Sequence, residues 1–299
     1  MKTIAAAMAC TFLLGAHAAL PEPTGTKPSY LEGPRGAVPN EDAIVRRIWT
    51  PGVEEGFIPQ GLTVAEGSLL VAMYQTTDPK QGTGPCRVYR IDIASGAVTG
   101  FFDVPPLPCG HAGGLAWLGN GQLLLADTKQ LFRIDMEAAF KAGKAEAGLR
   151  GTLKLGGALR GSFAAFDGKD PWIGTWTKEV NDARMYRFSA KLFDERDGQL
   201  IRDDVALESI PIPVEVQGAG FTKDGKLWLS ASNSKWGKLY CLDRQGKVEA
   251  QFPMVACVED VDFDVDGGLW AVSESGTRKY LQWETRFPFV FRLDVGRLR

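Results

Sequence analysis

The chain has 299 residues and a mass of 32.5 kDa, which is enough for one large domain or two ordinary ones. Hydrophobic residues make up 44% and charged residues 23%, which excludes disordered, collagen-like and coiled-coil proteins. The net charge of −2 provides no overall basic field, so we expect no nucleic-acid partner. The 35 glycines, 17 prolines and 10% aromatic residues favour a turn-rich all-β chain.

The chain begins with the pattern of a secretory signal peptide. Lys2 is followed by an uncharged apolar stretch over 4–15 and then by Ala16, His17 and Ala18, so we expect residues 1–18 to be removed. The apolar stretch is about a dozen residues long, which is shorter than the roughly 20 that a membrane-spanning helix needs. We therefore expect a mature protein without a membrane span, in the periplasm or secreted.

The next two segments precede the main body of the sequence. Residues 19–42 are rich in proline and glycine and predict a lead-in on the surface without a core of its own. Residues 43–49, Ala-Ile-Val-Arg-Arg-Ile-Trp, predict a strand. We expect one domain over 43–299, because single all-β domains reach this size.

One pattern then recurs five times along the chain. It consists of an apolar segment, a glycine turn, a second apolar segment, a variable loop, and a strand that ends in an aromatic and a charged residue. The copies begin at Gly61, Gly114, Phe163, Gly220 and Val261. Units of about 40 to 55 residues with an all-β pattern are typical of a β-propeller, in which each unit forms a blade of four antiparallel strands.

Five copies predict a five-bladed propeller. The fifth copy lacks an outer fourth strand, whereas the strand at 43–49 has no blade of its own. We therefore expect this strand to complete the last blade and close the ring, which would remove an open sheet edge. Six blades are the alternative, and they would require the long third unit to be split between Ser162 and Pro213.

Four cysteines remain once the signal peptide is removed. An even number in an oxidising compartment predicts disulfides, and four cysteines allow three pairings. Proximity in the sequence favours Cys86 with Cys109 and Cys241 with Cys257. A zinc site built from all four is the weaker alternative, because no close Cys-x-x-Cys spacing is present.

The copies resemble the NHL-repeat and gluconolactonase-like (senescence-marker-protein) propellers. The closest stretch is 216–221, Val-Gln-Gly-Ala-Gly-Phe, followed by Asp-Gly-Lys-Leu-Trp at 224–228, and the likeness covers nearly the whole mature chain. The gluconolactonase-like metal site uses a glutamate at the mouth of the first blade, with asparagines and an aspartate from later blades. Here Gln60 stands at the position of the glutamate, and the late Ser-Asp-Gly pattern reads Ser-Glu-Ser-Gly at 273–276.

A second resemblance concerns the start of the first blade. Gln60-Gly61-Leu62 is similar to the Gln-Gly-Leu motif of plant-type glutaminyl cyclases, which are five-bladed propellers. The Glu-Gly-Trp-Gly and Asn-Glu-Leu-Glu segments of that family have no clean match, and Glu259 is only a partial counterpart. The resemblance implies glutaminyl cyclase activity as a remote alternative.

Polar residues are expected to converge on the central funnel. In a propeller the innermost strands begin at the face where the second strands end, and these positions hold Gln60, Tyr74, His111, Asp127, Gln217, Asn233, Glu259 and Glu274. Such a ring offers oxygen ligands for Ca²⁺, which takes six to eight of them, and the carboxylates of Asp127, Glu259 and Glu274 suit it best. The alternative is that these side chains bond blade to blade and to channel water.

His111 is the only histidine of the mature chain. We expect it to act with Glu259 in catalysis, because a histidine can serve as a general base near neutral pH. A structural hydrogen bond beside Cys109 is the alternative. Tyr74, Trp176 and Trp236 lie at strand ends or in loops, where aromatic faces can stack on sugars or other rings. The long loop at 278–286 is expected to form a lip over the funnel or to pack on its rim.

These observations lead to two functions of different kinds. The first is a calcium-assisted hydrolase of the lactonase or esterase kind, with a small-molecule site in the funnel. The second is a non-catalytic propeller that binds a glycan, a peptide or a protein. In either case we expect a monomer.

Overall fold

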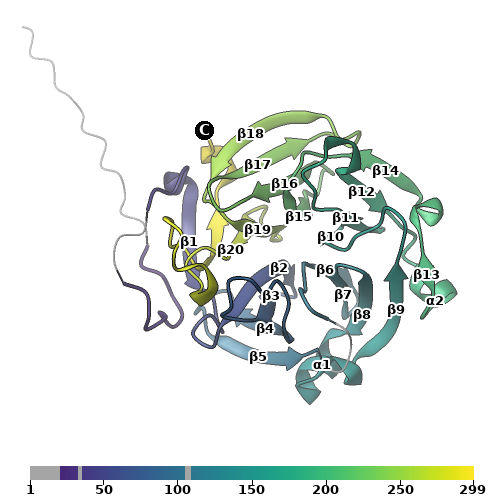
Figure 1. Cartoon of the computed structure of the whole chain (residues 1–299), viewed down its shortest axis with the longest axis horizontal. Coiled ribbons are helices and arrows are strands. Elements are labelled where there is room, and N and C mark those ends of the chain that lie inside the picture. Colours follow the sequence, from purple (N-terminus) through teal and green to yellow (C-terminus); the bar gives the residue numbers. More distant parts are fainter. Residues whose placement is uncertain (1–20, 33–35, 105–108) are drawn as a thin grey trace, which may run out of the picture.

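Five β-sheets surround a central axis, one for each copy of the repeat (Figure 1). The structure, a computed structural model, describes residues 21–32, 36–104 and 109–299. The predicted signal peptide, 1–18, lies outside the described residues. The fold is therefore the five-bladed β-propeller that the sequence predicts, and the alternative of six blades is wrong.

Each blade is built from strands that follow one another outward from the axis. Blade one holds β2 (Phe57–Ala65), β3 (Ser68–Gln75), β4 (Cys86–Asp92) and β5 (Val98–Asp103). Blade two holds β6 (Gly114–Gly119), β7 (Gln122–Asp127), β8 (Gln130–Asp135) and β9 (Leu149–Leu155). Blade three holds β10 (Phe163–Phe166), β11 (Pro171–Gly174), β12 (Arg184–Arg187) and β14 (Glu208–Pro211). Blade four holds β15 (Val216–Phe221), β16 (Leu227–Ser232), β17 (Gly237–Leu242) and β18 (Val248–Met254).

The fifth blade joins the two ends of the chain. It contains β19 (Val258–Phe263), β20 (Leu269–Ser273), β21 (Phe289–Leu293) and the N-terminal strand β1 (Ile44–Trp49). β1 pairs antiparallel with β21, from Ile44 opposite Leu293 to Trp49 opposite Phe289. The predicted closure of the ring by the first strand is confirmed.

An insertion explains why the third unit is long. Between β12 and β14 the chain forms α2 (Leu192–Arg196), the short β13 (Leu200–Ile201) and the 3-10 turn η4 (Asp203–Val205). β13 adds in parallel to β9 at the outer edge of blade two. The extra residues therefore extend a neighbouring blade and do not make a sixth one.

Helical segments are few and short. α1 (Met136–Ala142) begins where the Asp135 side chain accepts a hydrogen bond from the backbone N–H of Ala138, an N-cap that satisfies one of the helix's free donors. The remaining turns are 3-10 segments: η1 (Glu41–Ala43), η2 (Ala145–Ala147), η3 (Val180–Asp182), η5 (Arg278–Tyr280) and η6 (Val295–Arg297). Across the described residues, no helix is long and apolar enough to cross a membrane.

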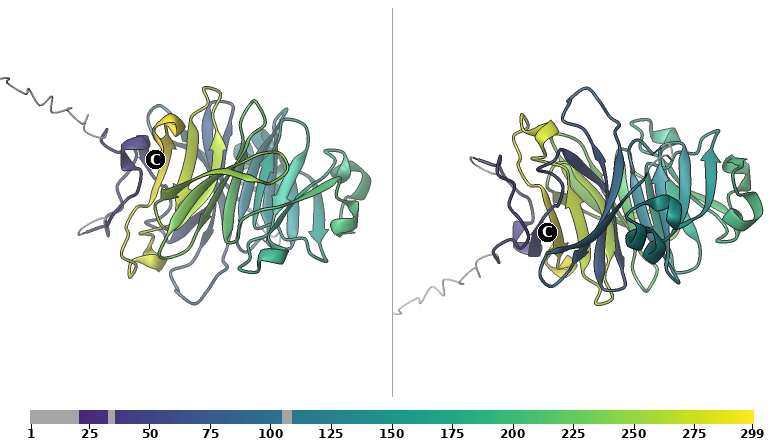
Figure 2. Two further views of the ribbon diagram at one scale, coloured as in Figure 1. Left: turned by 90° about the horizontal axis from the view of Figure 1, so that it is seen from above. Right: turned by 90° about the horizontal axis from the view of Figure 1, so that it is seen from below.

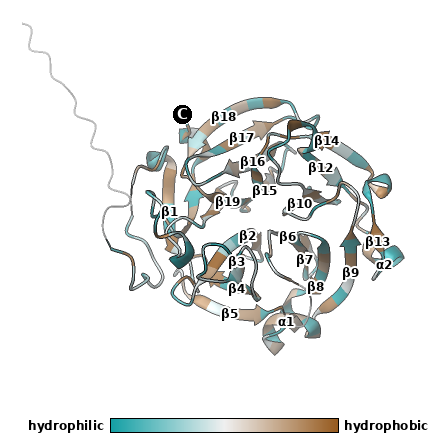
Figure 3. Ribbon diagram, in the orientation of Figure 1, coloured by the Kyte–Doolittle hydropathy of each residue, from teal (hydrophilic) through white to brown (hydrophobic). Residues whose placement is uncertain are grey.

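The hydrophobic core lies between neighbouring blades. Strands carry most of the hydrophobic residues and the connecting loops most of the hydrophilic ones (Figure 3). Trp270 and Phe291 of blade five and Phe132 of blade two are fully buried. This burial between sheets holds the ring together, since apolar area removed from water is the main favourable contribution to folding.

Small residues let the inner strands approach one another closely. A Cβ on Gly114 would lie 2.2 Å from the backbone nitrogen of Ala164, and one on Gly61 would lie 2.7 Å from that of Leu115. Glycine is required at both positions because no side chain fits there. The close approach leaves little room along the axis except where the inner strands begin and end.

The lead-in runs along the outer edge of blade five. The backbone N–H of Thr24 donates to the carbonyl of Arg47 at 3.0 Å, and the N–H of Trp49 donates to the carbonyl of Thr24 at 2.9 Å. Thr24 thus covers part of the edge of β1, which would otherwise leave unpaired backbone groups.

One of the two expected disulfides is present. Cys86 and Cys109 are bonded, with Cα atoms 6.0 Å apart, as predicted. Disulfides are typical of oxidising compartments, which fits the predicted location outside the cytoplasm.

The other expected disulfide is wrong, because Cys241 and Cys257 are both free and buried. Cys257 directly precedes β19, whereas Cys241 lies four residues along β17 from the same face of the ring. At about 3.3 Å per residue this places Cys241 roughly 13 Å below that face. A disulfide requires Cα atoms within about 7 Å, so proximity in sequence was misleading here.

Candidate functional site

We call the face at which the inner strands begin the mouth face. The loop between β3 and β4, residues 76–85, and η5 project from this face (Figure 2). Gln60 of β2, Gln217 of β15 and Glu259 of β19 each stand one residue before the position at which the inner strands pack closely. The repeat therefore brings one polar side chain per blade to the mouth of the central channel in three of the five blades.

Two buried carboxyl groups meet at this mouth. Glu259 lies on β19 and Glu274 follows the last residue of β20, and they are 2% and 8% exposed. The Gln217 side-chain amide donates to Glu259 Oε1 at 3.1 Å, and that of Gln60 donates to Glu274 Oε2 at 3.1 Å. Each carboxyl thus has one amide partner from a neighbouring blade.

Burial and mutual repulsion favour the protonated form of this pair. Burial raises the pKa of Glu259 well above its usual value, and the nearby carboxylates of Glu274 and Asp260 raise it further. Burial also raises the pKa of Glu274, which Lys279 and Gln60 counteract, to about 8. We conclude that Glu259 and Glu274 hold at least one proton between them at neutral pH.

A lysine that the sequence analysis did not single out lies beside the carboxyl pair. Lys279 of η5 is 4% exposed, and its Nζ donates to the hydroxyl of Tyr74 at 2.7 Å. Burial lowers the pKa of Lys279, and the Glu274 carboxylate counteracts this shift. Lys279 therefore supplies a cation facing Glu274 and positions the hydroxyl of Tyr74.

Tyr74 connects this lysine to His111. The two rings are stacked with centroids 4.8 Å apart. His111 Nδ1 lies 2.8 Å from the carbonyl oxygen of Gly82, so Nδ1 donates and carries the proton of the neutral ring. Burial lowers the pKa of His111, with the Gly82 carbonyl counteracting, which favours that neutral form. Nε2 is then left as the basic nitrogen.

Asp127 lies at the mouth, at the end of β7, as the sequence predicts, and its carboxylate holds a loop there. Its carboxylate accepts three consecutive backbone N–H bonds, from Gly110 at 3.2 Å, His111 at 2.7 Å and Ala112 at 2.9 Å. The carboxylate therefore fixes the loop that carries His111. These contacts do not support the predicted role of Asp127 as a metal ligand, which stays a prediction.

The described side chains do not fit a calcium site. Calcium needs six to eight oxygen ligands, yet no group of three or more His, Cys, Asp or Glu side chains is arranged to hold a metal in the described parts of the chain. Asp127 serves its loop, and Lys279 brings a positive charge to Glu274. We therefore derive no chemical step through calcium.

The remaining predicted ligand-binding residues lie outside the carboxyl pair. Asn233 Oδ1 accepts the backbone N–H groups of Lys235 and Trp236, and its amide reaches Glu215 at 3.3 Å. Asn233 therefore forms the turn between β16 and β17. Trp236 is partly buried in that turn, and Trp176, which follows β11, is 39% exposed.

Backbone conformation at the mouth is unusual for non-glycine residues. Ala112, Glu215 and Cys257 adopt positive φ angles of 53°, 57° and 61°, and each lies one or two residues before an inner strand. Such conformations cost about 1 to 3 kcal/mol and are frequent at functional sites.

The sequence carried a partial signal for the residues that were missed. Lys279 and Tyr280 belong to the long loop at 278–286, which was expected to lie over or beside the funnel. The hydroxyl of Tyr280 is hydrogen-bonded to that of Tyr74, and its ring stacks on Trp283 with centroids 3.8 Å apart. The contact of this loop with blade one joins residues about 200 positions apart, which sequence spacing does not show.

Several solved structures resemble this chain at low sequence identity. The chain is 13% identical to hydrazine synthase of Kuenenia stuttgartiensis, with a TM-score of 0.42 over 72% of this chain and 56% of that one. It is 14% identical to the Dos1 propeller, with a TM-score of 0.40 over 78% and 58%. Virginiamycin B lyase of Staphylococcus aureus, solved as an inactive variant with quinupristin, is 13% identical, with a TM-score of 0.38 over 76% and 66%.

These likenesses add no functional information. The chain spans between about a quarter and two thirds of the length of the solved structures that it matches. Comparison with protein-family models and with curated protein sequences finds no match. The strand pairing of the chain itself defines the class, a five-bladed β-propeller closed by its first strand.

Proposed function

We propose that the protein binds a small polar molecule at the mouth of its central channel and exchanges protons with it through Glu259 and Glu274. The observation that carries this proposal is the burial of two neighbouring carboxyl groups whose pKa values are both raised. Buried titratable groups with such shifts are concentrated at functional sites of proteins.

The shared proton suits the hydrolysis of a lactone or an ester. One carboxylate takes a proton from the attacking water, and the other carboxyl group gives a proton to the leaving oxygen. This division of roles requires one charged and one neutral group, which is the state that a close carboxyl pair favours near neutral pH. Glu274 is the more exposed member and faces Lys279, whose ammonium group would stabilise negative charge that develops on the substrate.

His111 and Tyr74 extend the site away from the carboxyl pair. With Nδ1 bonded to Gly82, the free Nε2 of His111 is placed to accept a hydrogen bond from a ligand. The stacked Tyr74 ring fixes the orientation of the imidazole. In this proposal His111 binds and orients the substrate, while Glu259 and Glu274 transfer the protons.

The experiment compares Glu259→Gln, Glu274→Gln and the double variant with the unchanged protein. We expect each single variant to reduce turnover of a lactone and ester panel by a factor of about 10² to 10⁴, the usual contribution of acid–base groups. Glu249→Gln is the matched control, because Glu249 is exposed on β18 and pairs with Lys226. Assays with and without a chelator test the calcium prediction separately.

A second measurement tests the pair without any substrate. NMR titration of ¹³C-labelled glutamate carboxyls should show two groups that titrate well above the usual range, and both should disappear in the double variant. Two glutamates that titrate normally, together with full turnover in the single variants, would show that the proposal is wrong.

A non-catalytic binding function is favoured by a different observation. Trp176 is 39% exposed, and Val180 of the following turn η3 is 76% exposed. An exposed indole face at a strand end suits a sugar or another ring. This alternative predicts ligand binding that does not depend on Glu259 or Glu274. Glutaminyl cyclase activity stays a prediction from the Gln60-Gly61-Leu62 motif alone.

A further inference from the structure

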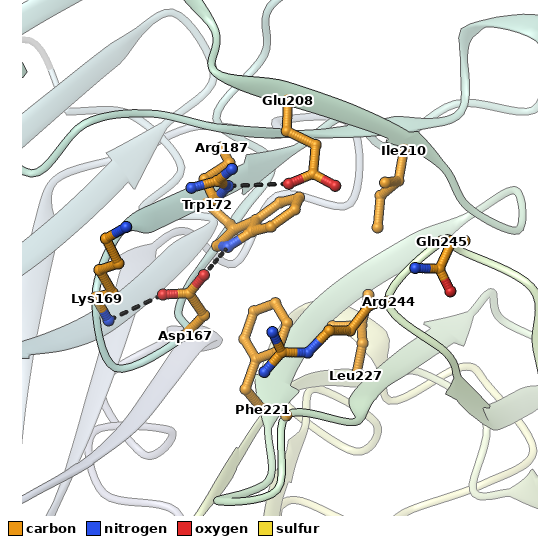
Figure 4. Close-up of a pocket in the computed structure, with 11 residues that line it drawn as sticks. Asp167, Lys169, Trp172, Arg187, Glu208, Ile210, Phe221, Leu227, Arg244 and Gln245 are labelled. Carbon is orange, nitrogen blue, oxygen red and sulfur yellow. Dashed lines mark hydrogen bonds and ion pairs between the residues drawn. The ribbon is translucent and has the colours of Figure 1, made fainter.

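A cavity lies on the face opposite the mouth, between blades three and four (Figure 4). Its volume is about 470 Å³, within the range of small-molecule pockets. Trp172 and Ile210 form the wall from blade three, and Phe221 and Leu227 form the wall from blade four. We call this space the interblade cavity.

The aromatic walls of the interblade cavity are held in place. Asp167 Oδ2 accepts a hydrogen bond from Trp172 Nε1 at 3.0 Å, and Oδ1 of the same carboxylate accepts the backbone N–H of Lys169 at 2.9 Å. Trp172 and Phe221 lie with ring centroids 5.7 Å apart at an angle of 43°. The two rings therefore contact each other and present one aromatic surface to the cavity, on which a flat group can pack.

The carboxylates that line the cavity already have partners. Glu208 Oε2 accepts a hydrogen bond from Arg187 Nε at 3.0 Å, and Arg187 also binds Asp170 at 2.8 Å. The charge of Arg187 is thus balanced by two carboxylates of its own blade. Asp167 is bonded to Trp172 and to its own turn.

Arg244, at the rim of the cavity, differs from Arg187 in its partners. It belongs to the turn between β17 and β18, and within the described parts of the chain it forms no ion pair with any carboxylate. Its guanidinium lies directly over Gly225, where a Cβ would come within 2.1 Å of Nη2. The glycine therefore leaves room for the guanidinium at the edge of the cavity, where it points toward Phe221 and away from Gln245 (Figure 4).

We propose that the interblade cavity binds a small aromatic carboxylate. The ring packs on the aromatic surface formed by Trp172 and Phe221, and the carboxylate accepts hydrogen bonds from the guanidinium of Arg244, which has the fork geometry that carboxylates prefer. Binding here is independent of proton transfer at the mouth, because the two sites lie at opposite ends of the inner strands.

The probes for this proposal share one ring and differ in charge. They are indole-3-acetate, its uncharged analogue indole-3-acetamide, and the cation tryptamine, each titrated into the full chain by calorimetry or by NMR of the Trp172 indole N–H. We expect indole-3-acetate to bind most tightly and tryptamine most weakly. Equal affinity for all three, or tighter binding of tryptamine, would overturn the proposal.

Matched variants test where indole-3-acetate binds. Arg244→Gln should weaken binding of indole-3-acetate about fivefold to tenfold and leave indole-3-acetamide unchanged, as loss of one exposed charged hydrogen bond implies. Lys247→Gln is the control, because Lys247 lies in the same turn but does not line the cavity. An equal loss in both variants would mean a general effect of charge and would contradict the proposal.

The mouth must also be excluded as the place where the probe binds. Glu274→Gln should leave the affinity for indole-3-acetate unchanged, since Glu274 lies at the other face. A loss of affinity in this variant would assign the probe to the mouth and overturn the interblade site. Thermal unfolding of each variant shows that a loss of binding does not come from a loss of folding.

Discussion

Two neighbouring residues of β19 are both buried carboxyls, yet their surroundings differ. Asp260 accepts backbone N–H bonds from Leu62 at 2.9 Å and Ala219 at 3.2 Å, so it links blade five to blades one and four. The carboxyl of Glu259 instead accepts a hydrogen bond from the side-chain amide of Gln217 and faces a second carboxyl, Glu274. The comparison shows that burial alone does not give a carboxyl its role.

The donors around each carboxyl account for the difference. Burial raises the pKa of both groups, but backbone N–H donors oppose the shift at Asp260, whereas the charge of Glu274 adds to it at Glu259. Asp262, further along the strand, is also bonded to its neighbours, through the hydroxyl of Thr63 at 2.7 Å and the N–H of Val64 at 2.9 Å. The carboxyls of β19 therefore differ along the strand: Glu259 at the mouth is titratable, whereas Asp260 and Asp262 link β19 to neighbouring blades.

The largest effect is expected from removing the structural link. Asp260→Ala leaves the buried backbone N–H groups of Leu62, Ala219 and Val261 without this acceptor, and we expect a loss of about 3 to 5 kcal/mol in the free energy of unfolding. Urea unfolding measures it. Asp266→Ala, at an exposed position of the following turn, is the control and should change stability by less than about 0.5 kcal/mol. Equal effects of the two substitutions would contradict the structural role of Asp260.

A disulfide lies at the mouth face, whereas the links of Asp260 within the channel are hydrogen bonds. The Cys86–Cys109 disulfide joins the start of β4 to the segment before His111 and closes a loop of 23 residues in sequence separation. Replacing both cysteines by serine should lower stability by about 3 kcal/mol, because the unfolded chain loses a constraint. Urea unfolding with and without reductant checks this, and reductant should have no further effect on the variant. Retained sensitivity to reductant would contradict the assigned pairing.

Much of the fold was predictable, because it follows from short repeats. The glycines at 61 and 114 recur at fixed places, since inner strands that pack closely allow no side chain there. The closing strand was predictable for a similar reason: the fifth copy lacked a fourth strand and 43–49 had no partner. The Cys241–Cys257 disulfide was predicted wrongly, because the position of each cysteine along its strand, and not their separation in the sequence, decides whether the two sulfur atoms meet.

The candidate site was predictable only in part. Gln60, Gln217 and Glu259 follow from the repeat, because they occupy equivalent positions at the start of inner strands. Lys279 did not follow, because its place depends on how the long loop folds back onto Tyr74 of another blade. Asp127 looked like a metal ligand, since the sequence does not reveal that three consecutive N–H groups converge on it.

A moderate effect is expected at the titratable group. The pKa of Glu274 is about 8 in the folded chain and about 4.5 when unfolded, so the folded state binds the proton more tightly between these values. Stability due to this group is therefore present below pH 4.5 and is lost as the pH rises through 8. The unchanged protein should therefore lose about 3 kcal/mol of stability between pH 5 and pH 8 through this group, and Glu274→Gln should remove that loss.

Urea unfolding at several pH values measures this slope. Glu249→Gln is the matched control, since Glu249 is exposed and pairs only with Lys226 at the surface. It should leave the pH dependence of stability unchanged. If Glu274→Gln and the unchanged protein lose stability in parallel, the carboxyl pair does not hold an extra proton at neutral pH, and the contrast with Asp260 disappears.

The smallest effect is expected at Trp176, which is neither part of the Glu259–Glu274 pair nor one of the structural links of Asp260. With 39% of its surface exposed and no described contact with the carboxyl pair, Trp176→Ala should lower stability by less than about 1 kcal/mol and leave the pH dependence unchanged. If the protein binds a glycan through its rim, the same substitution should weaken that binding, because loss of an indole face removes stacking area. Glycan-array binding of the variant therefore separates the two functions. A loss of glycan binding, with the titration of Glu274 unchanged, favours a binding propeller. Unchanged glycan binding leaves the mouth as the functional centre.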